Sequence, residues 1–115
     1  MAPRTRTRIA RSLALATAGA WLSVGALSAA TPAVIEQAGI AFRPKAVTIK
    51  AGEHVLFLNS DVFGHNVYSD TEGGAFDIGL QNSGSEVAVT FENPGRFILR
   101  CRIHPKMRAT VTVTE

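Results

Sequence analysis

Three side chains that bind soft or borderline metal ions lie within seven residues near the C-terminus. Cys101 offers a thiolate, His104 an imidazole and Met107 a thioether, in the order Cys-x-x-His-Pro-x-Met. Cys101 is the only cysteine of the chain, which excludes a disulfide framework and a cysteine-rich zinc site. A copper site of the blue type takes two histidines, one cysteine and a weak axial methionine. The segment supplies three of these four ligands.

The fourth ligand must come from elsewhere, and His65 is the best candidate among the three histidines, His54, His65 and His104. His65 follows a loop and begins a predicted strand, whereas His54 follows a turn at the far end of another strand and is expected at the surface. A loop histidine that only satisfies local hydrogen bonds is the alternative for His65. Zinc is the rival metal, although a structural zinc site rarely accepts a thioether in place of Cys or His.

The first thirty residues have the layout of a secretory signal peptide rather than of a folded element. Four arginines precede residue 12, an apolar run covers residues 13–27, and Ser28-Ala29-Ala30 provides the small residues of a cleavage site. A membrane anchor is the alternative, but the apolar run is shorter than the ~20 residues that a spanning helix needs. We therefore expect export, a signal peptide over residues 1–30 and one domain over residues 31–115, with no membrane attachment after cleavage.

Removing this segment changes the charge of the protein. The whole chain carries twelve basic and nine acidic residues, and all nine acidic residues lie after residue 30. Four of the basic residues leave with the signal peptide, so eight remain against nine acidic ones. The mature protein is thus nearly neutral, and its charge gives no support for nucleic-acid binding.

The mature chain reads as a series of short strands separated by turn signals, without any stretch of helical period. Alternating apolar residues and Gly, Pro and Asn turns of this kind are typical of a β-sandwich or barrel of seven to eight strands. Residues 31–37 are expected to form only a frayed lead. The strand at 54–59 is apolar on both faces, which predicts a sheet covered on both sides. The predicted strands cover residues 38–42, 46–50, 54–59, 65–68, 76–80, 87–92, 96–101 and 109–113.

At this point the sequence resembles a known family. The motif Cys101-x-x-His104-Pro105-x-Met107, together with Asn59 and the pair His65-Asn66, is similar to the type 1 copper proteins, the cupredoxins. The short Cys-to-Met loop is that of their amicyanin-like members, while plastocyanin-like members carry longer loops. The resemblance runs from about residue 40 to residue 113 and includes Pro94-Gly95-x-Phe97 before the ligand segment.

The resemblance implies a fold, a cofactor and a role. The fold is an all-β Greek-key β-sandwich, and the role is that of a periplasmic carrier of single electrons between redox partner proteins. One copper ion is then held by His65, Cys101 and His104 in a trigonal plane with Met107 as the weak axial ligand. Electrons would cross at the exposed edge of His104. We expect a monomer that is not an enzyme.

The family also suggests roles for the residues around the ligands. Asn59 is expected to tie the ligand loop to the backbone beside Cys101, and an apolar rim around His104 is expected from Phe63, Ile103 and Pro105. Gly64 stands where several relatives have proline, and its carbonyl can approach the metal as a second axial contact. Residues 76–80 have no firm role and are a candidate strap over the site.

Basic residues gather around the ligand segment at Arg100, Arg102, Lys106 and Arg108. Charges on such a loop are usually only a solvated face. The alternative is a docking patch, near Arg102, Lys106 and Arg108, for an acidic redox partner, which would speed association at low salt.

Two other functions use the same features. A periplasmic copper-handling protein (a chaperone, store or sensor) would need the same ligands without a carrier role. A structural accessory module would need none of them, and the presence of all four ligands argues against it. A multicopper enzyme needs more histidines than the three in this chain.

Overall fold

A computed structural model describes residues 14, 16–20 and 31–115, so most of the expected signal peptide, residues 1–30, lies outside the described residues. In the described ranges, no helix has the length and apolarity needed to cross a membrane. The described part is all-β, as expected. Its nine strands are β1 (Ala33–Gln37), β2 (Phe42–Arg43), β3 (Ala46–Lys50), β4 (His54–Asn59), β5 (Tyr68–Ser69), β6 (Phe76–Asp77), β7 (Glu86–Thr90), β8 (Gly95–Arg100) and β9 (Arg108–Thr114).

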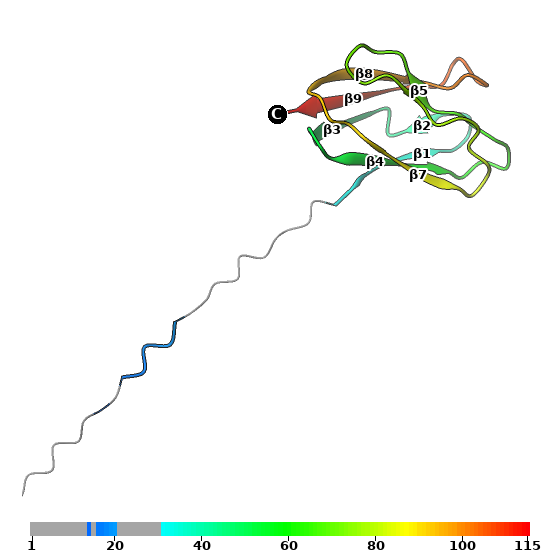
Figure 1. Ribbon diagram of the computed structural model, residues 1–115. Coiled ribbons are helices and arrows are strands. Elements are labelled where there is room, and N and C mark those ends of the chain that lie inside the picture. Colours follow the sequence, from blue (N-terminus) through cyan, green and yellow to red (C-terminus); the bar gives the residue numbers. More distant parts are fainter. Residues whose placement is uncertain (1–13, 15, 21–30) are drawn as a thin grey trace, which may run out of the picture.

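The strands form two sheets that pack face to face as a sandwich (Figure 1). One sheet has the order β2-β1-β4-β7 and the other has the order β3-β9-β8-β5-β6. The pairs β1–β4 and β3–β9 are parallel, and the remaining pairs are antiparallel. The expected sandwich is therefore confirmed, with nine strands where seven to eight were expected.

The core forms because alternate residues of each strand point between the sheets. On β4, Val55 and Phe57 are buried, and on β9 Val111 and Val113 are buried. On β8, Phe97 and Leu99 continue this inward series to Cys101, which follows the strand and is 1% exposed. The same alternation that fills the core thus carries the thiol to the end of the sandwich.

The expectation of a frayed segment at residues 31–37 is wrong. Ala33–Gln37 forms β1, which pairs in parallel with β4 over five residues and also pairs with β2. Ile35 and Gln37 are both fully buried there. The predicted strand at 38–42 is also wrong in most of its length, because the N–H of Ala38 closes a turn on the carbonyl of Ala41 and only Phe42 enters β2.

A second correction concerns the outer face of β4. Leu56 and Leu58 point away from the core and are half-buried, and among the described residues no third layer covers them. Their apolar character reflects partial cover by neighbouring side chains on an outer sheet face, so the sheet is not covered on both sides as expected.

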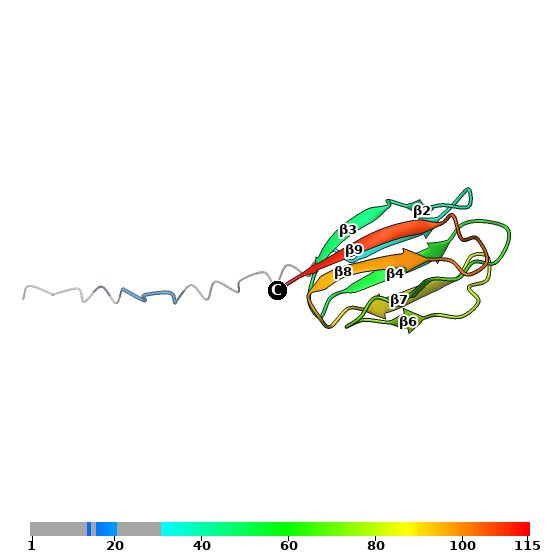
Figure 2. The same ribbon diagram turned by 90° about the horizontal axis from the view of Figure 1, so that it is seen from above.

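The loops at one end of the sandwich bring distant residues together. The connection from β4 to β5 and the connection from β8 to β9 both project from the end opposite the C-terminus, as the two views of Figures 1 and 2 show. His65 belongs to the first connection and His104 to the second. The tertiary fold therefore places the candidate ligands at one pole.

Candidate metal centre

Two strands fix the ends of the ligand segment. Cys101 directly follows β8 and Met107 directly precedes β9, and both side chains are 1% exposed. Because β8 and β9 pair in register up to Arg100 and Arg108, the segment between them is a short closed loop. The N–H of Met107 donates to the carbonyl of His104 at 2.9 Å, which tightens this loop into a turn.

The fold brings His65 to this loop from the β4–β5 connection, which joins the two sheets. The metal-binding atoms of His65, Cys101 and His104 all lie within 4.8 Å of one another. The Nδ1 atoms of the two histidines are 3.2 Å apart, and Cys101 Sγ lies 3.9 Å from His104 Nδ1. Two imidazole nitrogens and one sulfur that converge in this way are a donor set that copper accepts in both oxidation states.

Asn66 holds the sulfur from behind. Its N–H donates to Cys101 Sγ at 3.3 Å, and its side-chain Oδ1 accepts a hydrogen bond from the N–H of Arg102 at 3.2 Å. A hydrogen bond to a ligand sulfur withdraws electron density from it and fixes its direction. Asn66 is 5% exposed, so both bonds are shielded from water.

The expected role of Asn59 is therefore wrong, because Asn66 ties the ligand segment. The Nδ2 of Asn59 donates to the carbonyls of Phe63 at 2.9 Å and Gln81 at 3.0 Å. Its Oδ1 accepts from the N–H of Asp61 at 3.0 Å. Asn59 thus shapes the loop that carries His65. Asn66 adjoins His65 in the sequence and Asn59 lies six residues before it, and only their contacts separate the two roles.

Asp61 is a site residue that sequence reasoning missed. Its Oδ2 lies 2.7 Å from His65 Nε2, on the side of the ring away from Cys101 and His104. A carboxylate there accepts the Nε2–H, so the lone pair of the neutral ring lies on Nδ1, the nitrogen that faces the other donors. In the sequence, only the spacing of four residues between Asp61 and His65 could have indicated that the two side chains are in contact.

A tight turn before β2 holds the carboxylate of Asp61. The N–H of Gly39 donates to Oδ1 at 2.8 Å and the N–H of Ile40 donates to Oδ2 at 3.0 Å. Gly39 has φ +60° and Ile40 has φ +55°, an unusual value for a β-branched residue. The hydrogen bond from His65 is the main cause of a lowered pKa of Asp61, and these two N–H groups lower the pKa further.

A buried network lies behind His65. Gln81 forms a backbone bridge with His65, with N–H to carbonyl distances of 2.9 and 2.7 Å. The Nε2 of Gln81 donates to the carbonyls of Phe57 and Ser85, and its Oε1 accepts from Nε2 of Gln37 at 2.6 Å. This chain of contacts joins the His65 backbone to the core strands β1 and β4.

Residues 76–80 run beside the ligand-bearing connection. The N–H of Ile78 donates to the carbonyl of Val67 at 3.1 Å, and Asn66 Nδ2 donates to the carbonyl of Gly79 at 2.9 Å. A Cβ at Gly64 would lie 2.7 Å from Leu80 Cδ1, so glycine permits this close approach. The contact between the Gly64 carbonyl and a metal stays a prediction.

The outer side of the site is apolar. Phe63 and Ile103 are 42% and 49% exposed, and Pro105 is also exposed. The Phe63 ring centroid lies 5.7 Å from that of His104, which is half-buried. His54 lies exposed at the start of β4, away from these residues, as expected.

Comparison with known proteins decides the family. Residues 29–114 match the sequence profile of the copper binding proteins of the plastocyanin/azurin family. The chain belongs to this family. It is a copper-binding cupredoxin of the electron-transfer type, and its cofactor is copper. Cys101, His104 and His65 lie inside the matched range.

Individual relatives agree with this family. The chain is 32% identical to amicyanin-alpha of Methylorubrum extorquens, over 90% of this chain and 94% of that protein. The crystal structure of amicyanin from Paracoccus versutus superposes with a TM-score of 0.67 at 32% identity, covering 73% of this chain and 82% of that one.

A copper enzyme also contains this fold. The copper-containing nitrite reductase of Thermus scotoductus superposes with a TM-score of 0.69 at 30% identity. The match covers 74% of this cupredoxin but only 23% of the reductase chain.

Proposed function

We propose that this cupredoxin carries single electrons between redox partner proteins by outer-sphere transfer through the exposed edge of His104. His65, Cys101 and His104 would hold copper as the three strong ligands, and Met107 would be the weak fourth ligand. The convergence of Nδ1 of His65, Nδ1 of His104 and Sγ of Cys101 within 4.8 Å carries this proposal. Bound copper supplies one-electron chemistry between its Cu(I) and Cu(II) states.

The protein residues around this donor set support a carrier role. Cys101 and His65 are both buried. The sulfur of Cys101 accepts a hydrogen bond from the N–H of Asn66, and the ring of His65 is hydrogen-bonded to the carboxylate of Asp61. Ligands that are fixed before the metal binds move little when its charge changes. A site that moves little exchanges electrons quickly, whereas a copper store or chaperone must release its ion.

The port for electrons is the rim of the site. Phe63, Ile103 and Pro105 surround the half-buried His104 with exposed apolar surface. Such a surface excludes water when a partner docks and brings the two redox centres close together. Partner proteins of a carrier dock and leave repeatedly, so a small contact of this kind suits the role.

The basic residues near the site and the N-terminal segment suggest where and with what the protein works. Lys106 and Arg108 lie on or beside the ligand loop and favour an acidic partner. The arginine-rich start and the apolar run of residues 13–27 favour export to the periplasm, with residues 31–115 as the mature domain.

The decisive experiment is a copper titration of the mature domain, followed by visible absorption and EPR. We expect an intense blue thiolate-to-copper band, a narrow copper hyperfine splitting, and full cycling with chemical oxidant and reductant without loss of metal. A colourless product would contradict the ligand set. A blue product that loses copper on each reduction would favour the copper-handling alternative.

A further inference from the structure

The basic residues around the ligand loop are not equivalent. The Nε of Arg102 lies 2.7 Å from Asp77 Oδ2, and its guanidinium carbon lies 3.8 Å from the centre of the Tyr68 ring. The hydrogen bond between Arg102 and Asp77 raises the pKa of the arginine, and holds the pKa of Asp77 at about 2. The charge of Arg102 is therefore largely matched within the protein.

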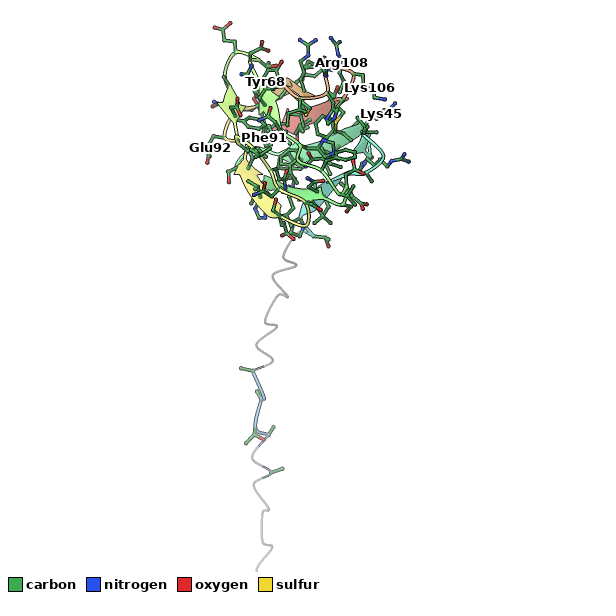
Figure 3. The ribbon with its side chains drawn as sticks, turned by 90° about the vertical axis from the view of Figure 1, so that its right-hand side faces the viewer. Lys45, Tyr68, Phe91, Glu92, Lys106 and Arg108 are labelled. Atoms are coloured by element: carbon green, nitrogen blue, oxygen red, sulfur yellow. The ribbon has the colours of Figure 1, made fainter. Side chains whose placement is uncertain are left out.

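Three other basic residues surround a hollow on the opposite side of the loop. Lys45, Lys106 and Arg108 line a depression of about 480 Å³, which we call the basic hollow. The buried residues Phe42 and Met107 lie beneath it, and the turn at residues 39–41 completes its lining. Figure 3 shows the three basic side chains on one side of the site-bearing end, away from Tyr68.

The fold, rather than the sequence order, brings Lys45 to the other two residues. β3 pairs in parallel with β9, with Ala46 opposite Thr110, and the N–H of Thr110 donates to the carbonyl of Lys45 at 2.9 Å. Lys45 thus emerges beside the start of β9, where Arg108 lies. This pairing puts a residue from before β3 next to the metal-ligand loop.

The charges of the basic hollow are not matched by acidic groups of the described chain. Within residues 31–115, Lys45, Lys106 and Arg108 form no ion pair, and all three are exposed. Asp61, from the β4–β5 connection, contacts the lining turn, but its carboxylate already accepts hydrogen bonds from Gly39, Ile40 and His65. The hollow therefore presents three uncompensated positive charges beside Met107.

We propose that the basic hollow receives a carboxylate-bearing segment of the redox partner protein, and that Arg102 is a structural cation outside this contact. This inference rests on the proposed carrier function and names the chemistry of its partner. Glutamate and aspartate side chains reaching Lys45, Lys106 and Arg108 would orient the partner so that the adjacent apolar rim covers His104. Charges placed at the edge of such a contact govern its association rate and its register.

A nucleic acid is a poorer occupant of the same surface. Residues 31–115 include eight basic and nine acidic residues, and the hollow offers a local cluster rather than a basic stripe. Phe42, the aromatic residue of its lining, is fully buried and offers no surface on which a base can stack.

The test uses the copper(I) holoprotein, which is diamagnetic, labelled with nitrogen-15 and titrated with hexaglutamate at about 10 mM ionic strength, where screening is weak. We expect amide shifts confined to residues 39–46 and 105–110. The double variant Lys45→Gln/Lys106→Gln should lose about fivefold in affinity, the scale of two exposed ion pairs. The matched control Lys50→Gln/Arg96→Gln, on the far parts of β3 and β8, should bind as the wild type does.

The outcomes separate the alternatives. Shifts centred on Tyr68 and Arg102, equal loss of affinity in both double variants, or absence of binding would each overturn the proposal. Binding of a short single-stranded oligonucleotide at the hollow without binding of hexaglutamate would overturn it as well. After oxidation of the same samples to copper(II), their blue absorption band reports the copper centre independently, so failure of the docking proposal is distinguishable from failure of the carrier function.

Discussion

The two ring nitrogens of His65 have different partners, and this division prepares the ring to bind a metal. Nε2 gives its proton to a hydrogen bond with Asp61 at 2.7 Å, while Nδ1 faces Nδ1 of His104 at 3.2 Å. A neutral imidazole has only one N–H, so fixing it at Nε2 leaves the lone pair at Nδ1. The unusual backbone of Ile40 is explained by the same contact, because it aims an N–H at the carboxylate.

Replacing Asp61 with Asn tests this arrangement. The carboxylate now accepts hydrogen bonds from Gly39, Ile40 and His65. The NH₂ group of an asparagine would face at least one of these three donors, and that hydrogen bond would be lost. We expect Asp61→Asn to bind copper about 10- to 100-fold more weakly, as is usual when a residue that orients a ligand is lost. Competition with a chelator measures this, with the exposed Asp70→Asn as control. Unchanged affinity would show that the turn alone positions His65.

Cys101 is the residue on which the spectrum depends. In Cys101→Ser the hydroxyl fits the same buried space but gives no thiolate-to-copper charge transfer. The blue band should disappear, while the β-sheet signal in far-UV circular dichroism should remain. A blue band that persists in this variant would contradict the assignment of Cys101 as a ligand.

At the scale of elements, β6 and the residues after it support the site from the side. Asp77 at the end of β6 accepts hydrogen bonds from Asn66 Nδ2 at 2.7 Å, from the N–H of Gly79 at 2.8 Å and from Arg102. Asn66 in turn bonds Cys101 Sγ. β6 has only two residues and is weak by itself, but these hydrogen bonds join it to both connections that carry the candidate ligands.

The lowered pKa of Asp77 makes this support depend on pH. Arg102 is the largest cause, and the pKa falls from an ordinary 3.8 to about 2. A carboxylate whose pKa is lower in the folded state stabilises the fold above about pH 4, and this stabilisation is lost between about pH 4 and pH 2. Asp77→Asn should therefore lower the free energy of unfolding at pH 6, and the difference from the wild type should shrink at pH 3.

Urea denaturation of the apoprotein at the two pH values measures this difference. Asp70→Asn, which changes another exposed acid of the same region, serves as the control. Because Asp77 and Arg102 are 38% and 60% exposed, solvent screening keeps the effect modest. A difference between Asp77→Asn and the wild type that grows toward pH 3 would contradict the assigned sign.

At the scale of the whole molecule, the metal site closes one end of the sandwich. The candidate ligands come from the β4–β5 connection, which joins the two sheets, and from the β8–β9 connection, which lies within one of them. An ion bound there crosslinks the two layers at the pole opposite the C-terminus (Figure 2). In a domain as small as residues 31–115, such a bond is a large share of the total stability.

Removal of copper should therefore lower the melting temperature. At a free copper concentration 100 times the dissociation constant, binding adds about 2.7 kcal/mol of stability. For a domain of this size that corresponds to a rise of about 10 °C or more. Differential scanning calorimetry of the apo and copper-loaded forms measures it. Cys101→Ser should show a smaller rise, and an equal rise in both would indicate that copper binds elsewhere.

The local sequence pattern was enough to predict the long strands and the candidate metal ligands. The predicted spans at 46–50 and 54–59 coincide with β3 and β4, because turn residues bound them and their inward positions alternate. Ala33–Gln37 was missed because its inward positions end on Gln37, a polar residue that suggests an exposed lead. Gln37 is buried where β1 pairs with β4, and its side-chain Nε2 donates a hydrogen bond to Gln81, 44 residues away.

By itself, the sequence determined the all-β class and proposed the four copper ligands, since residue chemistry and close spacing are local properties. The tertiary structure decided which residues form hydrogen bonds with those ligands. It assigned the sulfur contact to Asn66 rather than Asn59, and it brought Asp61 to His65. It also paired Arg102 with Asp77 and placed Lys45 beside Arg108. These facts depend on strand pairing and on loops that meet at one pole, so no short stretch of sequence contains them.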